Sequence, residues 1–169
     1  MPNLTTHLYV LRHAWAEDSA EDGTDFSRAL TKKGRKRFAR FAQLLVESGL
    51  EVDLIATSPL VRTFETAHLL ADAIADGPSD RQPPVKVVDV LAPAASWERL
   101  VEWTVQQDVA RVAWVGHAPC VGRLVALSIG DATAAIRMQK AAVASIDLPD
   151  GLGQPGELQW LVTAESVGM

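Results

Sequence analysis

The sequence predicts a three-layer α/β/α fold built on a mainly parallel β-sheet. Short apolar runs rich in strand-forming residues alternate over four units with longer segments whose apolar residues recur at helical spacing. Such alternation is typical of a parallel sheet with helices on both faces. A turn-rich segment between two late strand-like runs predicts a closing C-terminal antiparallel hairpin. The length of 169 residues suits one domain, so we expect a single domain over residues 1–169.

The first half of the chain supplies two strand–helix units. Thr31 can cap the first helix and Gly49 can follow its end, while Ser58 followed by Pro59 predicts the start of the second helix. The expected elements are a buried strand at Leu8–Leu11, a polar surface loop at Glu17–Arg28, a helix over Lys32–Ser48, a strand at Asp53–Thr57 and a helix over Pro59–Ala75.

The second half continues the alternation and then changes to a hairpin. Ser96 can cap a third helix, and Gly116 ends the strand that follows this helix. The expected elements are a linker at Asp76–Pro84, a strand at Val85–Val90, a helix over Ser96–Gln107, a strand at Arg111–Val115, a short helix after Pro119, and hairpin strands at Ala142–Leu148 and Glu157–Val162.

Composition excludes several classes of protein. Sixteen Lys and Arg against 21 Asp and Glu give a net charge of −5, which argues against a nucleic-acid partner. The single cysteine, Cys120, rules out a disulfide within the chain and fits a reducing compartment. Met1–Thr6 lacks a basic segment and no long apolar run exists, so we expect a cytoplasmic protein without a signal peptide or a membrane partner. The sequence leaves the oligomeric state open.

Basic side chains follow three of the predicted strands at the point where each strand ends. Arg12 and His13 follow the first strand, Arg62 lies just after the second, and His117 follows the fourth. Because ligands bind at the carboxyl ends of parallel strands, we expect one crevice to collect all four. Arginine matches phosphate oxygens, and neutral histidine can attack phosphorus. We expect the arginines to disfavour protonation of His13. No grouping has metal-ligand spacing, so neither a metal nor another cofactor is predicted.

Four blocks of sequence carry a resemblance to a known family. In chain order they are Leu11–Ala14, Arg28–Gly34, Ser58–Ala67 and Val115–Pro119. Together they resemble the histidine phosphatase superfamily, whose fold is phosphoglycerate mutase-like, and the short bacterial phosphohistidine phosphatases of the SixA type fit best.

The resemblance implies a role for each basic residue. His13 would take the phosphoryl group as a covalent phosphohistidine, and water would then release phosphate. Arg12, Arg62 and His117 would hold the phosphoryl oxygens. The implied protein is therefore a metal-independent phosphatase that acts on a phosphorylated protein or on a small phosphorylated metabolite.

One departure from the family pattern bears on the substrate. Longer members carry an acidic residue after the third strand, often within a cap, but Leu91–Ser96 contains no carboxylate and the chain has no room for a cap domain. An alkoxide leaving group needs a proton, whereas imidazole has a conjugate acid of pKa ~6.5. We therefore expect phosphohistidine in a protein as the substrate. Glu17 and Asp18 remain possible proton donors.

Two other functions stay open at this point. A small-molecule phosphomonoesterase could use Glu17 or Asp18 as its acid, and a phosphate- or phosphoprotein-binding module would have the same pocket without turnover. Trp15, beside the first block, is a candidate for the mouth of the site. The basic residues of the first helix predict either a solvated face or a docking patch for an acidic partner. They are Lys32, Lys33, Arg35, Lys36, Arg37 and Arg40.

Overall fold

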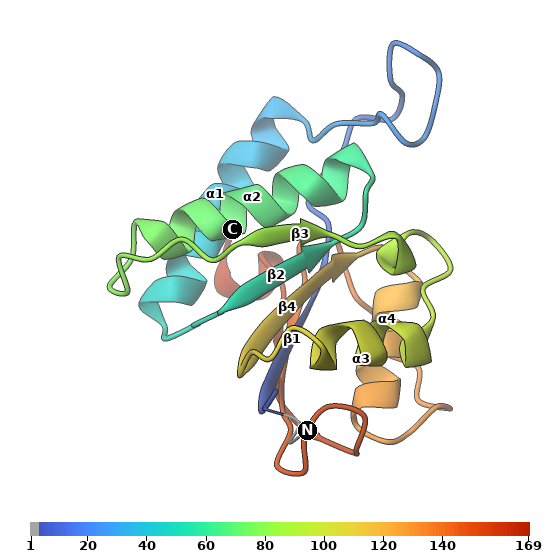
Figure 1. Ribbon diagram of the computed structural model, residues 1–169. Coiled ribbons are helices and arrows are strands. Elements are labelled where there is room, and N and C mark those ends of the chain that lie inside the picture. Colours follow the sequence, from blue (N-terminus) through green and yellow to red (C-terminus); the bar gives the residue numbers. More distant parts are fainter. Residues whose placement is uncertain (1–3) are drawn as a thin grey trace.

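The computed structural model describes residues 4–169 and contains a six-stranded sheet in the order β3-β2-β4-β1-β5-β6 (Figure 1). Strands β1 to β4 pair in parallel, and β5 and β6 are antiparallel, so the mainly parallel sheet and its closing hairpin are confirmed. Met1–Asn3, part of the segment in which no signal peptide is expected, lie outside the described residues. The strands are β1 His7–Arg12, β2 Leu54–Thr57, β3 Val85–Val87, β4 Arg111–Gly116, β5 Val143–Asp147 and β6 Glu157–Val162.

Helices cover both faces of the sheet, as Figure 1 shows, with α1 and α2 on one side and α3 and α4 on the other. Side chains of β1 alternate between the two layers: Tyr9 and Leu11 pack in the core under α1 and α2, and Leu8 and Val10 pack under α3 and α4. A strand buried on both faces is therefore apolar throughout. The helices are α1 Lys32–Glu47, α2 Val61–Ala75, α3 Trp97–Val105 and α4 Cys120–Ser128, with 3₁₀ turns η1 Asp89–Leu91 and η2 Glu165–Val167.

Two predicted boundaries are wrong for local physical reasons. The third strand ends at Val87 because the chain turns into η1, which places the side chain of Leu91 in the core. The second helix begins at Val61 with Leu60 as its N-cap residue, and no side chain caps it. The hydroxyl of Ser58, which sequence analysis assigned to the cap, accepts a hydrogen bond from the backbone N–H of Leu60 at 3.3 Å and also contacts a histidine.

The connections keep the carboxyl edge of the sheet uncovered by any large insertion. Residues 88–110, between β3 and β4, contain only η1 and α3, so no cap domain lies there. The predicted surface loop is mostly exposed and precedes α1, whose N-cap Thr31 accepts a hydrogen bond from the backbone N–H of Gly34 as predicted. Among residues 4–169, no helix is both long and apolar enough to cross a membrane.

Candidate active site

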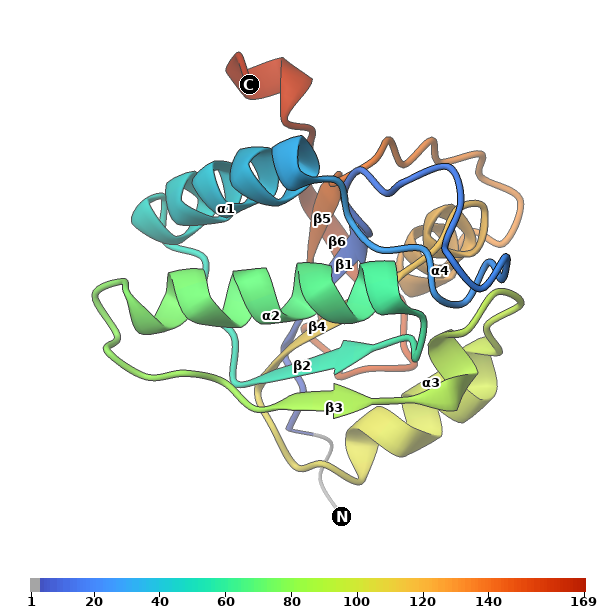
Figure 2. The same ribbon diagram turned by 90° about the horizontal axis from the view of Figure 1, so that it is seen from above.

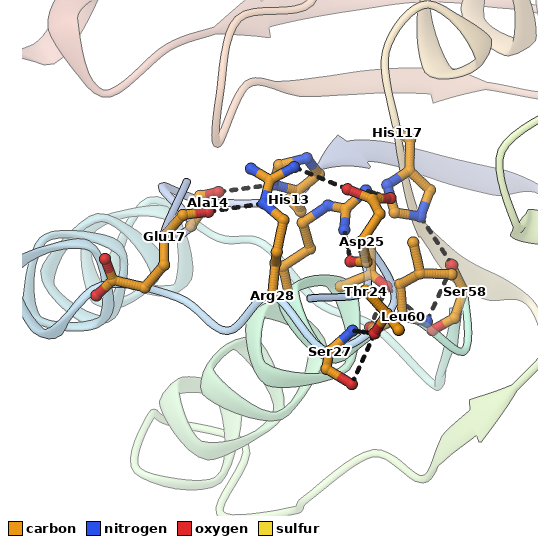
Figure 3. Close-up of polar contacts among 12 residues, drawn as sticks. His13, Ala14, Glu17, Thr24, Asp25, Ser27, Arg28, Ser58, Leu60 and His117 are labelled. Atoms are coloured by element: carbon orange, nitrogen blue, oxygen red, sulfur yellow. Dashed lines mark hydrogen bonds and ion pairs between the residues drawn. The ribbon is translucent and has the colours of Figure 1, made fainter. Parts of the chain in front are cut away.

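Two neighbouring strands bring two histidines together at the carboxyl edge of the sheet (Figure 3). Arg12 is the last residue of β1 and pairs in register with Gly116, the last residue of β4. The next residues, His13 and His117, therefore leave the sheet side by side, and their ring centroids are 5.4 Å apart. Arg62 reaches the same place from the first turn of α2, which follows β2. All four basic residues predicted from the sequence meet at this edge.

His13 has the properties of a neutral nucleophile. Its ring is almost fully buried, and Nδ1 lies 2.7 Å from the carbonyl oxygen of Ala14, which can only accept. Nδ1 therefore carries the proton, and Nε2 keeps a free lone pair. Burial is the main cause that lowers the pKa of His13 to about 3, with smaller contributions from Arg62, His117 and Arg12. The direction agrees with the sequence prediction, but desolvation outweighs the arginines as its cause.

His117 presents an unused hydrogen-bond donor. Its Nε2 lies 2.8 Å from the hydroxyl of Ser58, and its buried Nδ1 has no partner among the described residues. Burial first, and then Arg62, lower the pKa of His117 to about 4, so the ring is neutral at pH 7. A neutral imidazole has one nitrogen that carries a proton and one that can only accept a hydrogen bond. If the hydroxyl of Ser58 donates to Nε2, then Nδ1 carries the proton. That N–H is then free to bind an oxygen.

Both arginines also keep one buried donor unpaired. Arg12 donates from Nη1 to the carbonyl of Met138 at 3.0 Å, and Arg62 donates from Nη1 to the carbonyl of Asp25 at 2.9 Å. The Nε of each guanidinium is buried without a partner in the described part of the chain. An unsatisfied buried donor costs free energy, so these groups are rarely left without an acceptor. Such donors can bind the oxygen atoms of an anion.

Asp25 is a residue of the site that sequence analysis missed. Its carboxylate accepts from Nη2 of Arg62 at 3.1 Å and, as Figure 3 shows, from Nη1 of Arg28, at 2.8 Å. The hydrogen bond from Arg28, with a smaller contribution from Arg62, holds the pKa of Asp25 below its usual value. Asp25 is therefore ionised at neutral pH and opposes the lowering of the His117 pKa. An anion that binds Arg62 must share this guanidinium with Asp25.

The two candidate proton donors lie elsewhere. Glu17 and Asp18 are exposed, and Figure 3 shows the Glu17 carboxylate directed away from His13. Glu17 contacts Arg28 through its backbone and not through its side chain, because its carbonyl oxygen accepts a hydrogen bond from Nε of Arg28 at 2.7 Å. Within residues 4–169, no hydrogen bond or ion pair joins either carboxylate to the four basic residues.

A groove of about 550 Å³ opens directly beside Arg12. Trp15, Pro119 and Met138 line it, whereas His13, Arg62 and His117 are not among its lining residues. Cys120 is half-buried at the start of α4, and its Sγ accepts from the backbone N–H of Ala94 at 3.3 Å, so it is not simply a packed apolar side chain. The described residues contain no group of three His, Cys, Asp or Glu that could hold a metal ion.

Comparisons with known proteins agree with this geometry. Residues 8–111 match the family described as the histidine phosphatase superfamily (branch 1). An uncharacterised protein of Picosynechococcus sp. is 34% identical over 140 residues, which cover 80% of this chain and 81% of that protein.

Solved structures show a shared fold. The protein histidine phosphatase SixA in complex with tungstate superposes with a TM-score of 0.80 at 23% identity and covers 95% of this chain and 99% of its own. Phosphoserine phosphatase from Entamoeba histolytica, in complex with 3-phosphoglyceric acid, gives 0.67 at 14% identity and covers 94% and 98%. The same fold thus serves protein and small-molecule phosphatases, and it does not by itself select a substrate.

Proposed function

This chain belongs to the histidine phosphatase superfamily and is a phosphatase, and we propose that it removes phosphate from phosphohistidine in a partner protein through an intermediate on His13. The observation that carries the proposal is the set of three buried nitrogen atoms, unpaired among residues 4–169, around one neutral imidazole. They are Nε of Arg12, Nε of Arg62 and Nδ1 of His117. Donors fixed in advance around a nucleophile are what phosphoryl transfer requires.

The proposed reaction has two displacements at phosphorus. First, Nε2 of His13 attacks a phosphohistidine whose other ring nitrogen is protonated, the bond from phosphorus to the substrate nitrogen breaks, the substrate leaves as neutral imidazole, and the phosphoryl group moves to His13. Water then attacks this phosphoryl group, the bond to Nε2 breaks, the proton of the water passes to a phosphate oxygen, and inorganic phosphate leaves. In both steps the three donors bind the equatorial oxygens, whose charge changes during transfer. No metal takes part in either step.

Proton supply favours an imidazole leaving group. The pKa of Asp25 is lowered, so this carboxylate near the site is ionised at neutral pH and holds no proton to donate. Glu17 and Asp18 are exposed on the loop without contact to the basic residues. An alkoxide leaves poorly without a proton, whereas a phosphohistidine protonated on its other ring nitrogen releases neutral imidazole, which is a weaker base than an alkoxide by many powers of ten. The available groups therefore suit phosphohistidine better than a sugar phosphate.

The test compares kcat/KM for a phosphohistidine peptide, the matching phosphoserine peptide and a small phosphomonoester, all in the presence of a chelator. We expect the phosphohistidine peptide to be preferred by about 100-fold or more, because only its leaving group needs no acid. Preference for the phosphomonoester, with an activity limb lost in Glu17→Gln or Asp18→Asn, would instead support the small-molecule phosphatase. Phosphate binding without turnover of any substrate would support a binding module.

A further inference from the structure

The groove beside Arg12 extends well beyond the space that a phosphoryl group fills. It follows the loop that joins α4 to β5, which is seen in Figure 2 and in which the backbone N–H of Ala141 donates to the carbonyl oxygen of His13 at 3.1 Å. Arg12 forms its inner end through the bond to Met138, and the side chains of Arg137 and Lys140 stand on its outer part. We call this the site groove. Its volume of about 550 Å³ leaves room for several residues of a bound chain.

The outer part of the site groove is positively charged and unsatisfied. Arg137 and Lys140 are exposed, and within residues 4–169 neither side chain forms a hydrogen bond or an ion pair. Glu165 is the one acidic residue of the described chain that lines this groove. The rest of the molecule has the opposite sign, since the net charge is −5. A local cationic surface on an acidic protein indicates an anionic ligand.

A second basic surface begins on the other side of Trp15. The guanidinium of Arg37 lies 4.0 Å from the centre of the Trp15 ring, so this one stacked pair borders both surfaces. Beyond it, Lys33, Lys36 and Arg40 line a further groove of about 410 Å³ along α1, which we call the helix groove. Arg35, in contrast, is paired with Glu65 at 2.6 Å and is not part of it. Basic side chains thus continue from Arg12 across Trp15 onto α1, where Arg37 also donates to the carbonyl oxygen of Met169.

We propose that the site groove and the helix groove bind an acidic segment of the partner protein on either side of its phosphorylated side chain. The proposal rests on the proposed function for the identity of that side chain and adds the sequence class around it. Carboxylates of the segment pair with Arg137 and Lys140 in the site groove and with the lysines of α1 in the helix groove. Two grooves of this combined extent exceed what one small metabolite fills, and their charge selects acidic neighbours rather than the phosphoryl group itself.

The test measures binding with fluorescent peptides whose central residue is a phosphonate-type analogue of phosphohistidine that cannot be hydrolysed. One peptide has acidic flanks, and its mate has lysines at the same positions. Fluorescence anisotropy gives the affinity of each for the wild type, for Arg137→Glu/Lys140→Glu and for Arg81→Glu/Lys86→Glu. The last variant makes the same change in charge outside both grooves. Turnover of a phosphohistidine peptide is measured in parallel on every protein.

We expect the wild type to bind the acidic peptide about tenfold or more tightly than its mate, because several exposed charge pairs each contribute modestly. Arg137→Glu/Lys140→Glu should lose or reverse this preference, and the control variant should keep it. If the first variant does not fold, Lys36→Glu/Arg40→Glu in the helix groove makes the same test. Equal affinity of the wild type for both peptides, or a preference that survives both groove variants, would overturn the proposal.

The two proposals fail in different ways. A preference for the acidic peptide without turnover of any phosphohistidine peptide supports binding of an acidic segment in the grooves and refutes the proposed reaction. Efficient turnover that does not depend on the flanking charges supports the proposed reaction and refutes the binding of an acidic segment in the grooves. High salt gives an independent check, since the acidic preference should shrink as exposed charge pairs are screened, and a salt-insensitive preference would contradict it.

Discussion

Strand β1 carries a histidine at each end, and the two have opposite environments. His7, at its first position, uses both ring nitrogens: Nδ1 lies 2.5 Å from the carboxylate of Asp147, and Nε2 lies 2.8 Å from the hydroxyl of Ser145. His13, just beyond its last position, uses Nδ1 alone and faces a histidine and two arginines. The same residue type is therefore structural at one end and suited to chemistry at the other.

Ser145, His7 and Asp147 are linked in the order of a catalytic triad, but the surroundings of a triad are missing. Ser145 is only 2% exposed and lies within β5, where it pairs in register with Tyr9 on one side and Trp160 on the other. Its backbone belongs to the hydrogen-bonded sheet, and within residues 4–169 the buried unpaired side-chain nitrogens lie on Arg12, Arg62 and His117 rather than beside Ser145. What distinguishes His13 is the hydrogen-bonding capacity left unused around it.

The largest expected effect separates the two histidines by activity. His13→Ala should reduce kcat/KM on the order of 10⁴-fold, because the nucleophile is lost, whereas His7→Ala should stay within about twofold of the wild type. Steady-state kinetics measures both, with circular dichroism to show that each variant is folded. Comparable losses of kcat/KM in the two variants would contradict the assignment of a catalytic role to His13 and a structural role to His7.

The next effect concerns the unpaired donors. Arg62→Lys keeps the positive charge but removes Nε and the planar fork, so we expect kcat/KM to fall about 100-fold. The matched control is Arg111→Lys, whose side chain pairs with Asp53 at the other end of β4 and should leave kinetics unchanged. If Arg62→Lys retained full activity, charge alone would suffice, and the role given to the buried Nε would be wrong.

The pH dependence of stability reports the burial of the two site histidines. Unfolded histidine binds a proton near pH 6.5, whereas the pKa values of His13 and His117 are lowered to about 3 and about 4. Between these values the unfolded state holds more protons, so the free energy of unfolding falls as the pH drops below 6.5. Each histidine contributes a slope of up to about 1.4 kcal/mol per pH unit.

Urea denaturation at pH 7 and pH 5 measures this loss, and His13→Asn should reduce it by about 2 kcal/mol, since one histidine acts over roughly 1.5 pH units. His68→Asn is the control, because His68 packs beside Phe64 away from the site. An unchanged pH dependence in His13→Asn would show that His13 titrates normally in the folded protein.

The smallest effect is the structural contribution of His7. His7→Ala leaves the buried hydroxyl of Ser145 without this partner and removes the contact of Nδ1 with the Asp147 carboxylate, and we expect the free energy of unfolding to fall by about 1 kcal/mol. Chemical denaturation at pH 7 gives the value. No loss of stability in this variant would contradict the structural role assigned to this end of β1.

The basic residues of the site were predictable from the sequence because strand ends are local features. Arg12, His13 and His117 directly follow apolar runs, and parallel strands place such residues on one edge. Arg62 was found through its block even though the predicted helix start was two residues early. The layers and the hairpin followed equally from apolar periodicity.

The remaining features depend on contacts between distant segments. Asp25 lies in a polar loop whose pattern predicts only exposure, and its partner Arg62 is 37 residues away. A serine before Pro59 favours a helix cap locally, yet the hydroxyl of Ser58 forms a hydrogen bond with His117, which is 59 residues further along the chain. The main cause of the low His13 pKa, burial, is likewise a product of packing. The pair Asp25 and Arg28, three residues apart, was the one local signal available.

In the proposed reaction His13 carries the phosphoryl group, so the decisive experiment is to trap this intermediate. The protein is mixed with a ³²P-phosphohistidine peptide, quenched in alkali within milliseconds, digested and mapped. We predict an alkali-stable, acid-labile label on the peptide that contains residue 13, present in His7→Ala and absent in His13→Ala. A label on any other residue, or undiminished turnover by His13→Ala, would contradict the account.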